Sequence, residues 1–470
     1  MKRILVANRG EIACRIIRAA RALGMETIAV YSDADAGALH CQMADVAVHI
    51  GPSPATQSYL NVDAVLAAGI EHGAQGVHPG YGFLSENTVF ARAAEARGMA
   101  WIGPSPESIE DMGDKHRARS IAQRCGVPVL PGSAAFLPGE SPERILQAAQ
   151  RVGFPLLVKA AGGGGGIGMK LVNDASTLVA AVASTQSQAL KAFNDASVYL
   201  ERYVGRARHI EVQVFGYGDG TAVHLFEREC SVQRRFQKII EESPAPTLPA
   251  QVLEQMLAAA VALPMGQRYR GAGTVEFILD ANSHEFFFLE MNTRIQVEHG
   301  VTEAITGWDL VRSQIELAAG QLQPLPQSAI GRRGAAIECR VYAENPLKNF
   351  LPSPGLLERF DFPAALDGVR IDTGVRQGDT ITPFYDPMIA KVITSGANRA
   401  LALERMQQVL GMTEIGGIRH NREFLLAVLR HPAFVAGTVD THFVERERQA
   451  LLDVLVETAQ ATPARQEQPA

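Results

Sequence analysis

One segment of the chain places polar side chains at every second position. Residues 288–301 read FLEMNTRIQVEHGV. Because successive side chains of a β-strand point to opposite faces, we expect one polar and one largely apolar face here. The polar face would consist of Glu290, Asn292, Arg294, Gln296 and Glu298. A solvated edge strand would show the same alternation, but a metal-binding group directly followed by a cation and a base favours a functional site.

The first polar positions of this segment suit a hard cation. Glu276 lies on the preceding apolar run, and a polar stretch at residues 280–283 joins the two runs as a predicted hairpin. Mg²⁺ is usually held by a few carboxylates together with substrate phosphates. Glu276, Glu290 and Asn292 are therefore candidate metal ligands. Arg294 could orient an anion, and Glu298 could act as a base.

The overall composition excludes several classes of protein. The chain has 470 residues, so we expect more than one domain, and 47% of residues are hydrophobic and 20% charged, as in globular proteins. The net charge of −6 argues against nucleic acid as the main partner. No apolar run reaches membrane-spanning length, and the start continues as strand, turn and helix rather than as a signal peptide. The five cysteines form no CxxC pair, which favours reduced thiols in a cytosolic enzyme.

The N-terminal third alternates strands and helices. A strand at 3–7, a helix at 12–23 and a strand at 27–31 predict a βαβ unit with a parallel sheet. A GxGxxG motif is missing, so a dinucleotide site is not supported. The stretch HPGYGFLSEN at 78–87 precedes a helix. It could be a shaped functional loop or a structural turn capped by Ser85, and both interpretations stand equally.

A glycine-rich run lies in the middle of the chain. Residues 162–168 contain six glycines, including Gly165 and Gly166, between predicted strands at 154–161 and 169–172. Without Cβ atoms, backbone N–H groups can close on a phosphate chain. A GK[ST] sequence and a following helix are both missing, so this is not a P-loop. A flap over bound ATP explains the run better than a flexible linker, because strands bound it closely.

Other polar residues around this run are candidate nucleotide ligands. Lys115, at the start of a helix, and Lys159 could bind phosphates, although each alone would be taken for a surface lysine. Backbone groups at 201–204 could read an adenine edge, with Glu201 accepting from its amino group. His209 and Glu211 share a strand face, but a zinc pattern is missing. The basic segment 229–238 suits an anion or a solvated strand equally.

Several long motifs, in order, resemble the biotin carboxylases. They are HPGYGFLSEN, KAAGGGGGIGM, ERYV, HIEVQVFG, CSVQRRFQKIIEESPAP, EMNTRIQVEH and YDPMIAKVI, and the similarity runs from about residue 1 to about 446. The family consists of ATP-grasp ligases that catalyse the first half-reaction of biotin-dependent carboxylases. ATP phosphorylates bicarbonate to carboxyphosphate, which yields CO₂ and phosphate. The phosphate takes the N1′ proton of biotin, and the biotin enolate captures CO₂.

The resemblance implies a role for each matching position. It implies catalytic roles for Lys238, Arg294, Glu298 (as the base) and Arg340 (for carboxyphosphate and the enolate). It implies ATP-binding roles for Lys115, Lys159, Gly165, Gly166, Glu201, Arg202, Tyr203, Val204, His209, Gln233, Glu276 and Glu290. It implies bicarbonate or biotin contacts for Lys238, Arg294, Gln296, Val297 and Arg340. It implies that Glu276, Glu290 and Asn292 are the metal ligands and that they hold two Mg²⁺ or Mn²⁺ ions.

The family also implies an α/β and α+β multidomain fold. We expect a Rossmann-like pre-ATP-grasp domain at 1–112, an ATP-grasp domain at 113–320 with a lid at about 131–204, and a β-rich C-terminal domain at 321–446. A partly disordered tail is expected at 447–470. Residues 320–334 read as a linker, and Asp386 could support the active site, join a subunit contact, or simply precede a turn.

Three residues depart from the family pattern. Ile167 stands where the glycine loop usually carries Arg, Phe236 where QRRHQK is usual, and Gly300 where VEHPVTE is usual. The first two remove polar groups near the phosphates. They bear on ATP affinity, flap closure and the identity of the parent carboxylase.

The missing biotinyl motif implies separate partners. After residue 2, the chain has a Met-Lys pair only at 169–170, inside the glycine-loop region. We therefore expect biotin on a separate carrier protein, a carboxyltransferase subunit, a homodimer and a cytoplasmic location. The leading hypothesis is the biotin carboxylase component of acetyl-CoA carboxylase. The alternatives are a propionyl-CoA, methylcrotonyl-CoA, urea or pyruvate type of carboxylase, another ATP-grasp ligase, or a non-catalytic ATP-binding assembly or regulatory subunit.

Overall fold

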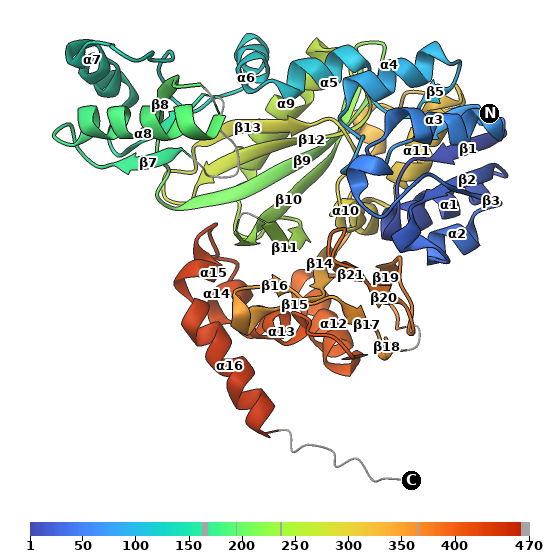
Figure 1. Cartoon of the computed structure of the whole chain (residues 1–470). Coiled ribbons are helices and arrows are strands. Elements are labelled where there is room, and N and C mark those ends of the chain that lie inside the picture. The colour runs from blue at the N-terminus through green and yellow to red at the C-terminus, as the bar shows by residue number, and fades with distance from the viewer. Residues whose placement is uncertain (162–167, 194, 236, 364–365, 462–470) are drawn as a thin grey trace. The chain divides into compact units, whose positions relative to one another are not determined.

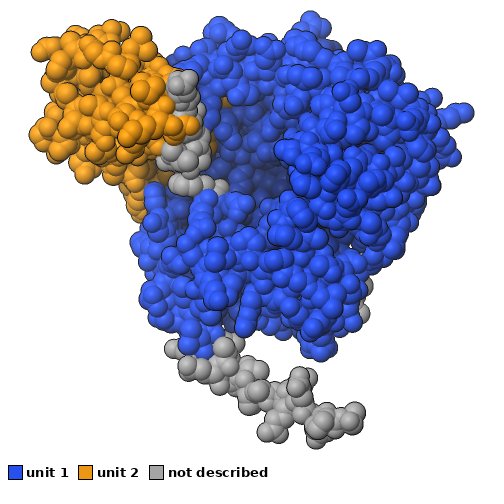
Figure 2. All heavy atoms as spheres, in the orientation of Figure 1, with its two compact units in different colours: residues 1–127, 208–277, 290–470 blue, residues 128–207, 278–289 orange. Residues whose placement is uncertain are grey.

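Two structural units divide the chain. The computed structural model describes residues 1–161, 168–193, 195–235, 237–363 and 366–461 (Figure 1). Unit 1 comprises residues 1–127, 208–277 and 290–470, and unit 2 comprises residues 128–207 and 278–289 (Figure 2). The expectations for Gly165, Gly166, Ile167 and Phe236 lie outside the described residues.

A parallel sheet forms the N-terminal part of unit 1, as the βαβ pattern predicts. Its strand order is β3-β2-β1-β4-β5. The strands are β1 (Arg3–Val6), β2 (Glu26–Tyr31), β3 (Val46–His49), β4 (Gly76–His78) and β5 (Ala100–Trp101). The helices of this part are α1 (Gly10–Ala22), α2 (Leu39–Met43), α3 (Val62–Glu71), α4 (Thr88–Ala96), α5 (Pro106–Gly113) and α6 (Lys115–Arg124). Leu5, Ile28 and Val77 are fully buried, because both faces of such a sheet are covered.

A larger sheet carries most of the polar residues of interest. Its order is β13-β12-β9-β10-β11-β14-β21-β19. The strands are β9 (Ala207–Tyr217), β10 (Ala222–Arg234), β11 (Gln237–Ser243), β12 (Arg270–Asp280), β13 (Phe286–Asn292), β14 (Ala335–Tyr342), β19 (Val369–Thr373) and β21 (Met388–Gly396). Strands β12 and β13 are neighbours joined by a short turn, which confirms the predicted hairpin. The sheet continues across the boundary that we expect near residue 320.

Helices and small two-stranded sheets complete unit 1. The helices are α9 (Ala250–Gly266), α10 (His299–Thr306), α11 (Leu310–Ala318), α12 (Arg399–Met412), α13 (Arg422–Arg430), α14 (Pro432–Val435), α15 (Phe443–Arg446) and α16 (Arg448–Ala461). The strand pairs are β15 (Glu344–Asn345) with β16 (Leu351–Pro352), β17 (Gly355–Leu356) with β20 (Thr380–Ile381), and β18 (Arg359–Asp361) with β22 (Glu414–Gly416). Helix α16 continues to Ala461 and so covers part of the segment that we expect to be a partly disordered tail.

Unit 2 is a small sheet flanked by helices. Its antiparallel strands, β6 (Leu156–Ala160), β7 (Met169–Val172) and β8 (Val198–Arg202), pair in the order β7-β6-β8. The helices are α7 (Pro142–Val152) and α8 (Leu178–Phe193). The Ser141 side chain caps α7 by accepting from the Arg144 N–H. Across the described parts of both units, every helix is too short or too polar to cross a lipid bilayer.

The expected alternation of side chains stops earlier than the sequence suggests. Strand β13 ends at Asn292, and residues 293–298 are irregular before α10 begins. The Thr293 N–H donates to Glu86 Oε1 (3.1 Å) instead of to a neighbouring strand. The prediction of one continuous polar strand through Glu298 is therefore wrong. Beyond Asn292, the side chain of Glu86 accepts the backbone hydrogen bond that a neighbouring strand would otherwise accept.

Candidate active site

A partly buried lysine lies at the centre of the polar cluster. Lys238, on β11, donates from Nζ to Glu211 Oε2 (2.6 Å), Glu276 Oε1 (2.8 Å) and Glu298 Oε1 (2.8 Å). Burial alone would lower the pKa of Lys238, but these three carboxylates hold it well above its ordinary value. The segment that the sequence left open between an anion site and a solvated strand thus carries a charged, partly buried ammonium.

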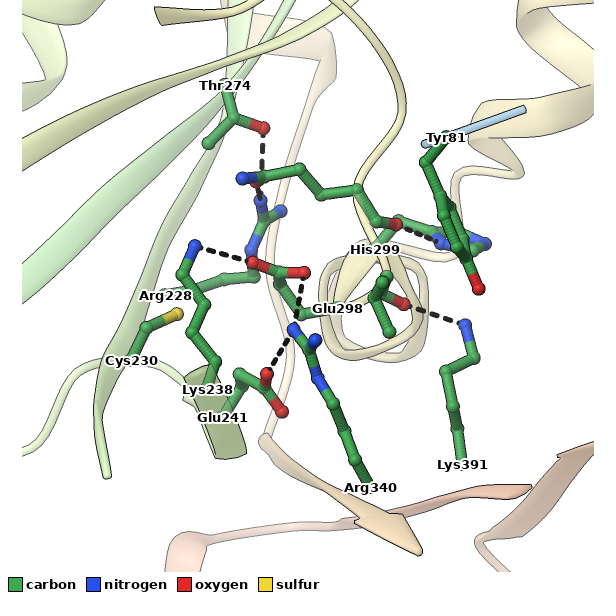
Figure 3. A network of polar contacts seen from close by, with 12 residues as sticks. Tyr81, Arg228, Cys230, Lys238, Glu241, Thr274, Glu298, His299, Arg340 and Lys391 are labelled. Atoms are coloured by element: carbon green, nitrogen blue, oxygen red, sulfur yellow. Dashed lines mark hydrogen bonds and ion pairs between the residues drawn. The ribbon is translucent and has the colours of Figure 1, made fainter. Parts of the chain in front are cut away.

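Glu298 joins two cations on opposite sides (Figure 3). Its Oε1 accepts from Lys238, and its Oε2 accepts from Arg340 Nη2 (2.9 Å) on β14. Burial would raise the pKa of Glu298, but Lys238 and Arg340 outweigh it and keep the pKa well below its ordinary range. Glu298 is therefore an ionised carboxylate and can accept a proton.

Arg340 has a second acidic neighbour. Glu241 Oε1 lies 2.5 Å from the Arg340 Nη2. Burial raises the pKa of Glu241 to about 7, against the opposing effect of Arg340. The guanidinium of Arg340 therefore lies between a firmly ionised carboxylate and one that titrates near neutrality.

Arg228 connects the sheet to the segment that carries Glu298. It is fully buried on β10. Its donors reach the following acceptors: Glu211 Oε1 (2.6 Å), Gln213 Oε1 (2.8 Å), Thr302 Oγ1 (2.9 Å), Thr274 Oγ1 (3.1 Å) and Gln296 Oε1 (2.7 Å). These bonds use all five N–H donors of a guanidinium. A fully bonded buried arginine of this kind fixes the strands and the Gln296 side chain in one arrangement.

The metal-like half of the site lies on the hairpin. Glu276 Oε1 also accepts from Asn292 Nδ2 (2.9 Å) and Gln296 Nε2 (2.9 Å). Burial and the nearby Glu276 raise the pKa of Glu290. A divalent cation would relieve the repulsion that Glu276 exerts on Glu290, so the two carboxylates fit Mg²⁺ or Mn²⁺. Asn292 Oδ1 is engaged by Arg294 Nη2 (2.9 Å).

A further donor group surrounds the same glutamate. His209 Nε2 lies 3.1 Å from Glu276 Oε2, and Gln233 Nε2 lies 3.0 Å from His209 Nδ1. Within the described residues, His209, Glu211 and Glu276 offer ligand atoms within 4.8 Å of one another, and so do Glu211, Cys230 and Glu298. The Lys238 ammonium already neutralises carboxylates of both groups.

The motif HPGYGFLSEN supports the site from outside the hairpin. Glu86 Oε2 accepts from Arg294 Nε (2.9 Å), and Tyr81 donates from its hydroxyl to Glu11 Oε1. Asn8 Nδ2 donates to the Tyr81 carbonyl (2.8 Å) and so holds the loop. Gly80 has φ +64°, and a Cβ there would lie 3.0 Å from Asn8 Nδ2.

The structure assigns the loop's helix cap to a different residue. Asn87, whose side chain accepts from the Phe90 N–H, caps α4 in place of the predicted Ser85. Together with the contacts of Tyr81 and Glu86, this shows a loop that is built into the polar cluster.

The remaining nucleotide candidates divide between the two units. In unit 2, Lys159 Nζ donates to Glu201 Oε1 (2.6 Å), so the carboxylate that we expected to face adenine pairs with the lysine expected to bind phosphate. Arg202 and Tyr203 follow on the same chain segment, and Val204 is buried. In unit 1, Lys115 is exposed in the first turn of α6.

Four supporting residues were not among the predicted site residues. They are Glu86, Glu211, Arg228 and Glu241. Glu86 lies inside a quoted motif, and Glu211 shares a predicted strand face with His209, so both had a signal in the sequence. Glu241 likewise lies inside the quoted motif CSVQRRFQKIIEESPAP. Arg228 had no signal, because partners such as Gln296 and Thr302 are far away along the chain.

Gly300, a departure from the family pattern, lies against buried neighbours. A Cβ at Gly300 would lie 2.6 Å from Ile393 Cδ1 and 2.9 Å from Glu338 Oε2. The side chains of β14 and β21 are therefore packed against a residue without a side chain.

Comparisons with known proteins agree with this architecture. Residues 1–109 match the biotin carboxylase N-terminal domain, residues 114–327 match the ATP-binding domain of the carbamoyl-phosphate synthase L chain, and residues 338–446 match the biotin carboxylase C-terminal domain. These three matches cover most of the chain.

Individual relatives are similar over almost the whole chain. The mitochondrial methylcrotonoyl-CoA carboxylase subunit alpha of Glycine max is 48% identical over 96% of this chain, which spans 61% of the length of that relative. Biotin carboxylase 1 of Bacillus subtilis is 47% identical over 95% of this chain and 98% of its own length.

A solved structure has the same fold. It is the biotin carboxylase domain dimer of 2-oxoglutarate carboxylase from Hydrogenobacter thermophilus, in complex with MgADP, ADP and bicarbonate. It is 41% identical, with a TM-score of 0.87 over 96% of this chain and 98% of that chain. The chain belongs to the biotin carboxylase family of ATP-grasp ligases.

Proposed function

We propose that the chain carboxylates biotin with ATP and bicarbonate. The observation that carries this proposal is the arrangement of Lys238, Glu298 and Arg340, in which a buried ionised carboxylate lies between two cations. Such a site can bind a small anion and accept its proton. The bicarbonate in the complex of the Hydrogenobacter relative supports the choice of anion.

The roles of the individual side chains follow from their charges. Glu298 takes the proton of bicarbonate, so that a bicarbonate oxygen attacks the γ-phosphorus of ATP, the bond to the β-phosphate oxygen breaks, and carboxyphosphate and ADP form. Lys238 and Arg294 neutralise the anion as it approaches the phosphate. Glu276 and Glu290, with Asn292, would hold Mg²⁺ or Mn²⁺, which supplies positive charge to the phosphates.

Later steps place negative charge on biotin. Carboxyphosphate yields CO₂ and phosphate, the phosphate takes the N1′ proton, and the enolate attacks CO₂. Arg340 is placed to stabilise the enolate, since its guanidinium is buried beside Glu298. We assign ATP contacts to the residues named from the family resemblance, including Lys115, Lys159 and His209.

The domains and partners are part of the same proposal. We propose domains at 1–112, 113–320 and 321–446, a separate biotin carrier, a carboxyltransferase subunit and a homodimer. The dimer of the Hydrogenobacter relative supports the last of these.

An ATPase assay tests the half-reaction. Purified protein is given ATP, Mg²⁺ and bicarbonate with and without free biotin, and ADP release is measured. We expect biotin to stimulate release, and removal of bicarbonate or Mg²⁺ to abolish the stimulation. An ADP release that is indifferent to biotin contradicts the proposal, and tight ATP binding without bicarbonate-dependent ADP release favours the non-catalytic assembly subunit.

The final acceptor requires a second assay. The sequence favours acetyl-CoA as the simplest acceptor, whereas the 48% identity to a methylcrotonoyl-CoA carboxylase subunit favours 3-methylcrotonoyl-CoA. Purified carriers and carboxyltransferases of each type, supplied with the protein and [¹⁴C]bicarbonate, would show which acyl-CoA becomes labelled. Labelling of acetyl-CoA alone would exclude the methylcrotonoyl assignment, and the reverse would exclude acetyl-CoA.

A further inference from the structure

A fully buried lysine contacts the turn that carries Glu298. Lys391, on β21, has no exposed surface and is the cross-strand partner of Arg340 on β14. Its Nζ donates to the Val297 carbonyl (2.7 Å), and Figure 3 shows its side chain pointing to that turn. The family resemblance assigns no role to Lys391.

The backbone bonds of this turn are long. The His299 N–H reaches the Gln296 carbonyl at 3.3 Å, and the Val301 N–H reaches the Glu298 carbonyl at 3.4 Å. Hydrogen bonds weaken beyond about 3.2 Å, whereas a bond from an ammonium group is short and strong. The bond from Lys391 therefore acts directly on the carbonyl of the Val297–Glu298 peptide, whereas Arg228, Lys238 and Arg340 hold the side chains of Gln296 and Glu298.

The same ammonium also reaches helix α1 of the N-terminal part. Lys391 Nζ lies 3.3 Å from Glu11 Oε1, the oxygen that accepts from the Tyr81 hydroxyl. Asp372 Oδ2 lies 3.9 Å from it. Lys391 thus connects the turn of Glu298 with the loop of Tyr81, two segments more than 200 residues apart in the sequence.

The neighbouring acids keep this lysine charged. Burial alone would lower the pKa of Lys391, but Glu11, Glu338 and Asp372 outweigh it and raise the pKa above its ordinary value. His299 and Arg370 also face the group, and Arg370 acts against the acids. The ammonium therefore persists at neutral pH and can act as a permanent donor.

We propose that Lys391 is a positioning residue, which holds the Val297–Glu298 peptide and couples the base to Tyr81 through Glu11. The inference rests on the proposed function, because Lys391 affects the reaction only by positioning Glu298, the proposed base. Lys391 itself contacts neither the phosphates nor the anion in this role. Its loss should slow the bicarbonate-dependent step without weakening ATP binding.

The first test compares three variants. Lys391→Met removes the donor and the charge, Glu11→Gln/Lys391→Met removes both charges and so protects folding, and Glu11→Gln alone keeps the bond to Val297. We expect kcat for biotin-dependent ADP release to fall about 10- to 100-fold in both variants that lack Lys391. The KM for ATP should change less than twofold, and Glu11→Gln should lose far less activity.

Chemical rescue separates positioning from general damage. Lys391→Ala leaves space for a small amine, so ethylammonium chloride should restore part of kcat, while the same concentration of sodium chloride should not. A kcat within threefold of the wild type in the variants without Lys391 would overturn the proposal. So would an equal loss in kcat and in ATP affinity with no rescue by the amine.

Hydrogen exchange makes the result independent of activity. Mass spectrometry should show faster amide exchange in peptides that cover residues 296–301 when Lys391 is replaced, with unchanged exchange in β12. If the wild type lacks biotin-dependent activity, the proposed function fails, and exchange alone decides the positioning role. Unchanged exchange at 296–301 in both variants without Lys391 refutes that role.

Discussion

The hairpin of β12 and β13 and the turn at residues 293–298 contribute neighbouring halves of one polar cluster, but they are held in different ways. Glu276, Glu290 and Asn292 take their places from regular strands. The turn has little regular structure, and Glu86, Arg228 and Lys391 hold it from three distant segments. A local pattern therefore determines the first half, whereas tertiary contacts determine the second.

This difference has a consequence for substitution. In the hairpin, backbone hydrogen bonds between the strands hold each position in place even when its side chain is substituted. In the turn, a change in a distant supporting residue can displace the base.

Replacement of the base should have the largest effect. Glu298→Gln keeps the shape but cannot accept a proton, so kcat for bicarbonate-dependent ADP release should fall about 10²- to 10⁴-fold. Steady-state kinetics would measure this, with ADP binding as a control for the nucleotide site. Retention of a tenth of the activity or more would mean that another group is the base.

Removal of the buried arginine should cost stability. Arg228→Met leaves Glu211 without its guanidinium partner, and breaking a buried ion pair costs about 3–5 kcal/mol. Denaturant unfolding would measure the loss. The matched control is Arg92→Met, since Arg92 forms ion pairs on the exposed surface, and it should be indistinguishable from the wild type. Equal stabilities of the two variants would show that Arg228 is not a structural link.

The sequence predicted the hairpin half well because alternation is a local property. The β12–β13 hairpin follows from the apolar runs and the polar turn between them. The same alternation placed Glu298 on a strand that ends at Asn292, because the sequence does not show that Glu86 accepts from the Thr293 N–H. Glu298 was thus proposed as the base from its residue type and its spacing, although the strand inferred for it was wrong.

Arg228 and Lys391 show what sequence reasoning could not find. Arg228 lies outside the quoted motifs, and Lys391 lies in YDPMIAKVI but was assigned no role there. Their importance arises from burial and from partners such as Thr302 and Val297, which lie more than 70 residues away.

The free energy of unfolding should depend on pH through Glu241, which lies beside Arg340. The pKa of Glu241 rises from an ordinary 4.5 to about 7 in the folded chain. Protonation of Glu241 therefore stabilises the folded state. This stabilisation is fully present below pH 4.5 and is lost as the pH rises through 7. Relative to Glu241→Gln, the wild type should lose about 3 kcal/mol between pH 4.5 and 8. Parallel curves of unfolding free energy against pH would contradict this expectation.

A substitution in the hairpin should act on the metal. Glu276→Gln lowers the negative charge offered to Mg²⁺, so the Mg²⁺ concentration for half-maximal activity should rise about tenfold, the effect of about 1.4 kcal/mol. Titration of activity with Mg²⁺ at saturating ATP measures it. Asp280→Asn, at the exposed end of the same hairpin, serves as the matched control and should leave the Mg²⁺ dependence unchanged. An equal shift in both variants would remove Glu276 from the metal site.

The smallest effect tests the comparison most directly. Glu86→Gln can still accept from the Thr293 N–H but loses its ion pair with Arg294, and solvent screens this half-exposed pair. The KM for bicarbonate should rise about threefold, as expected for a weak surface ion pair, while the Mg²⁺ dependence stays as in the wild type. Glu276→Gln should instead change the Mg²⁺ dependence and leave the KM for bicarbonate nearly as in the wild type. If Glu86→Gln changed the Mg²⁺ dependence instead, the turn and the hairpin would respond as one body, and the division between a locally determined half and a tertiary half would have to be abandoned.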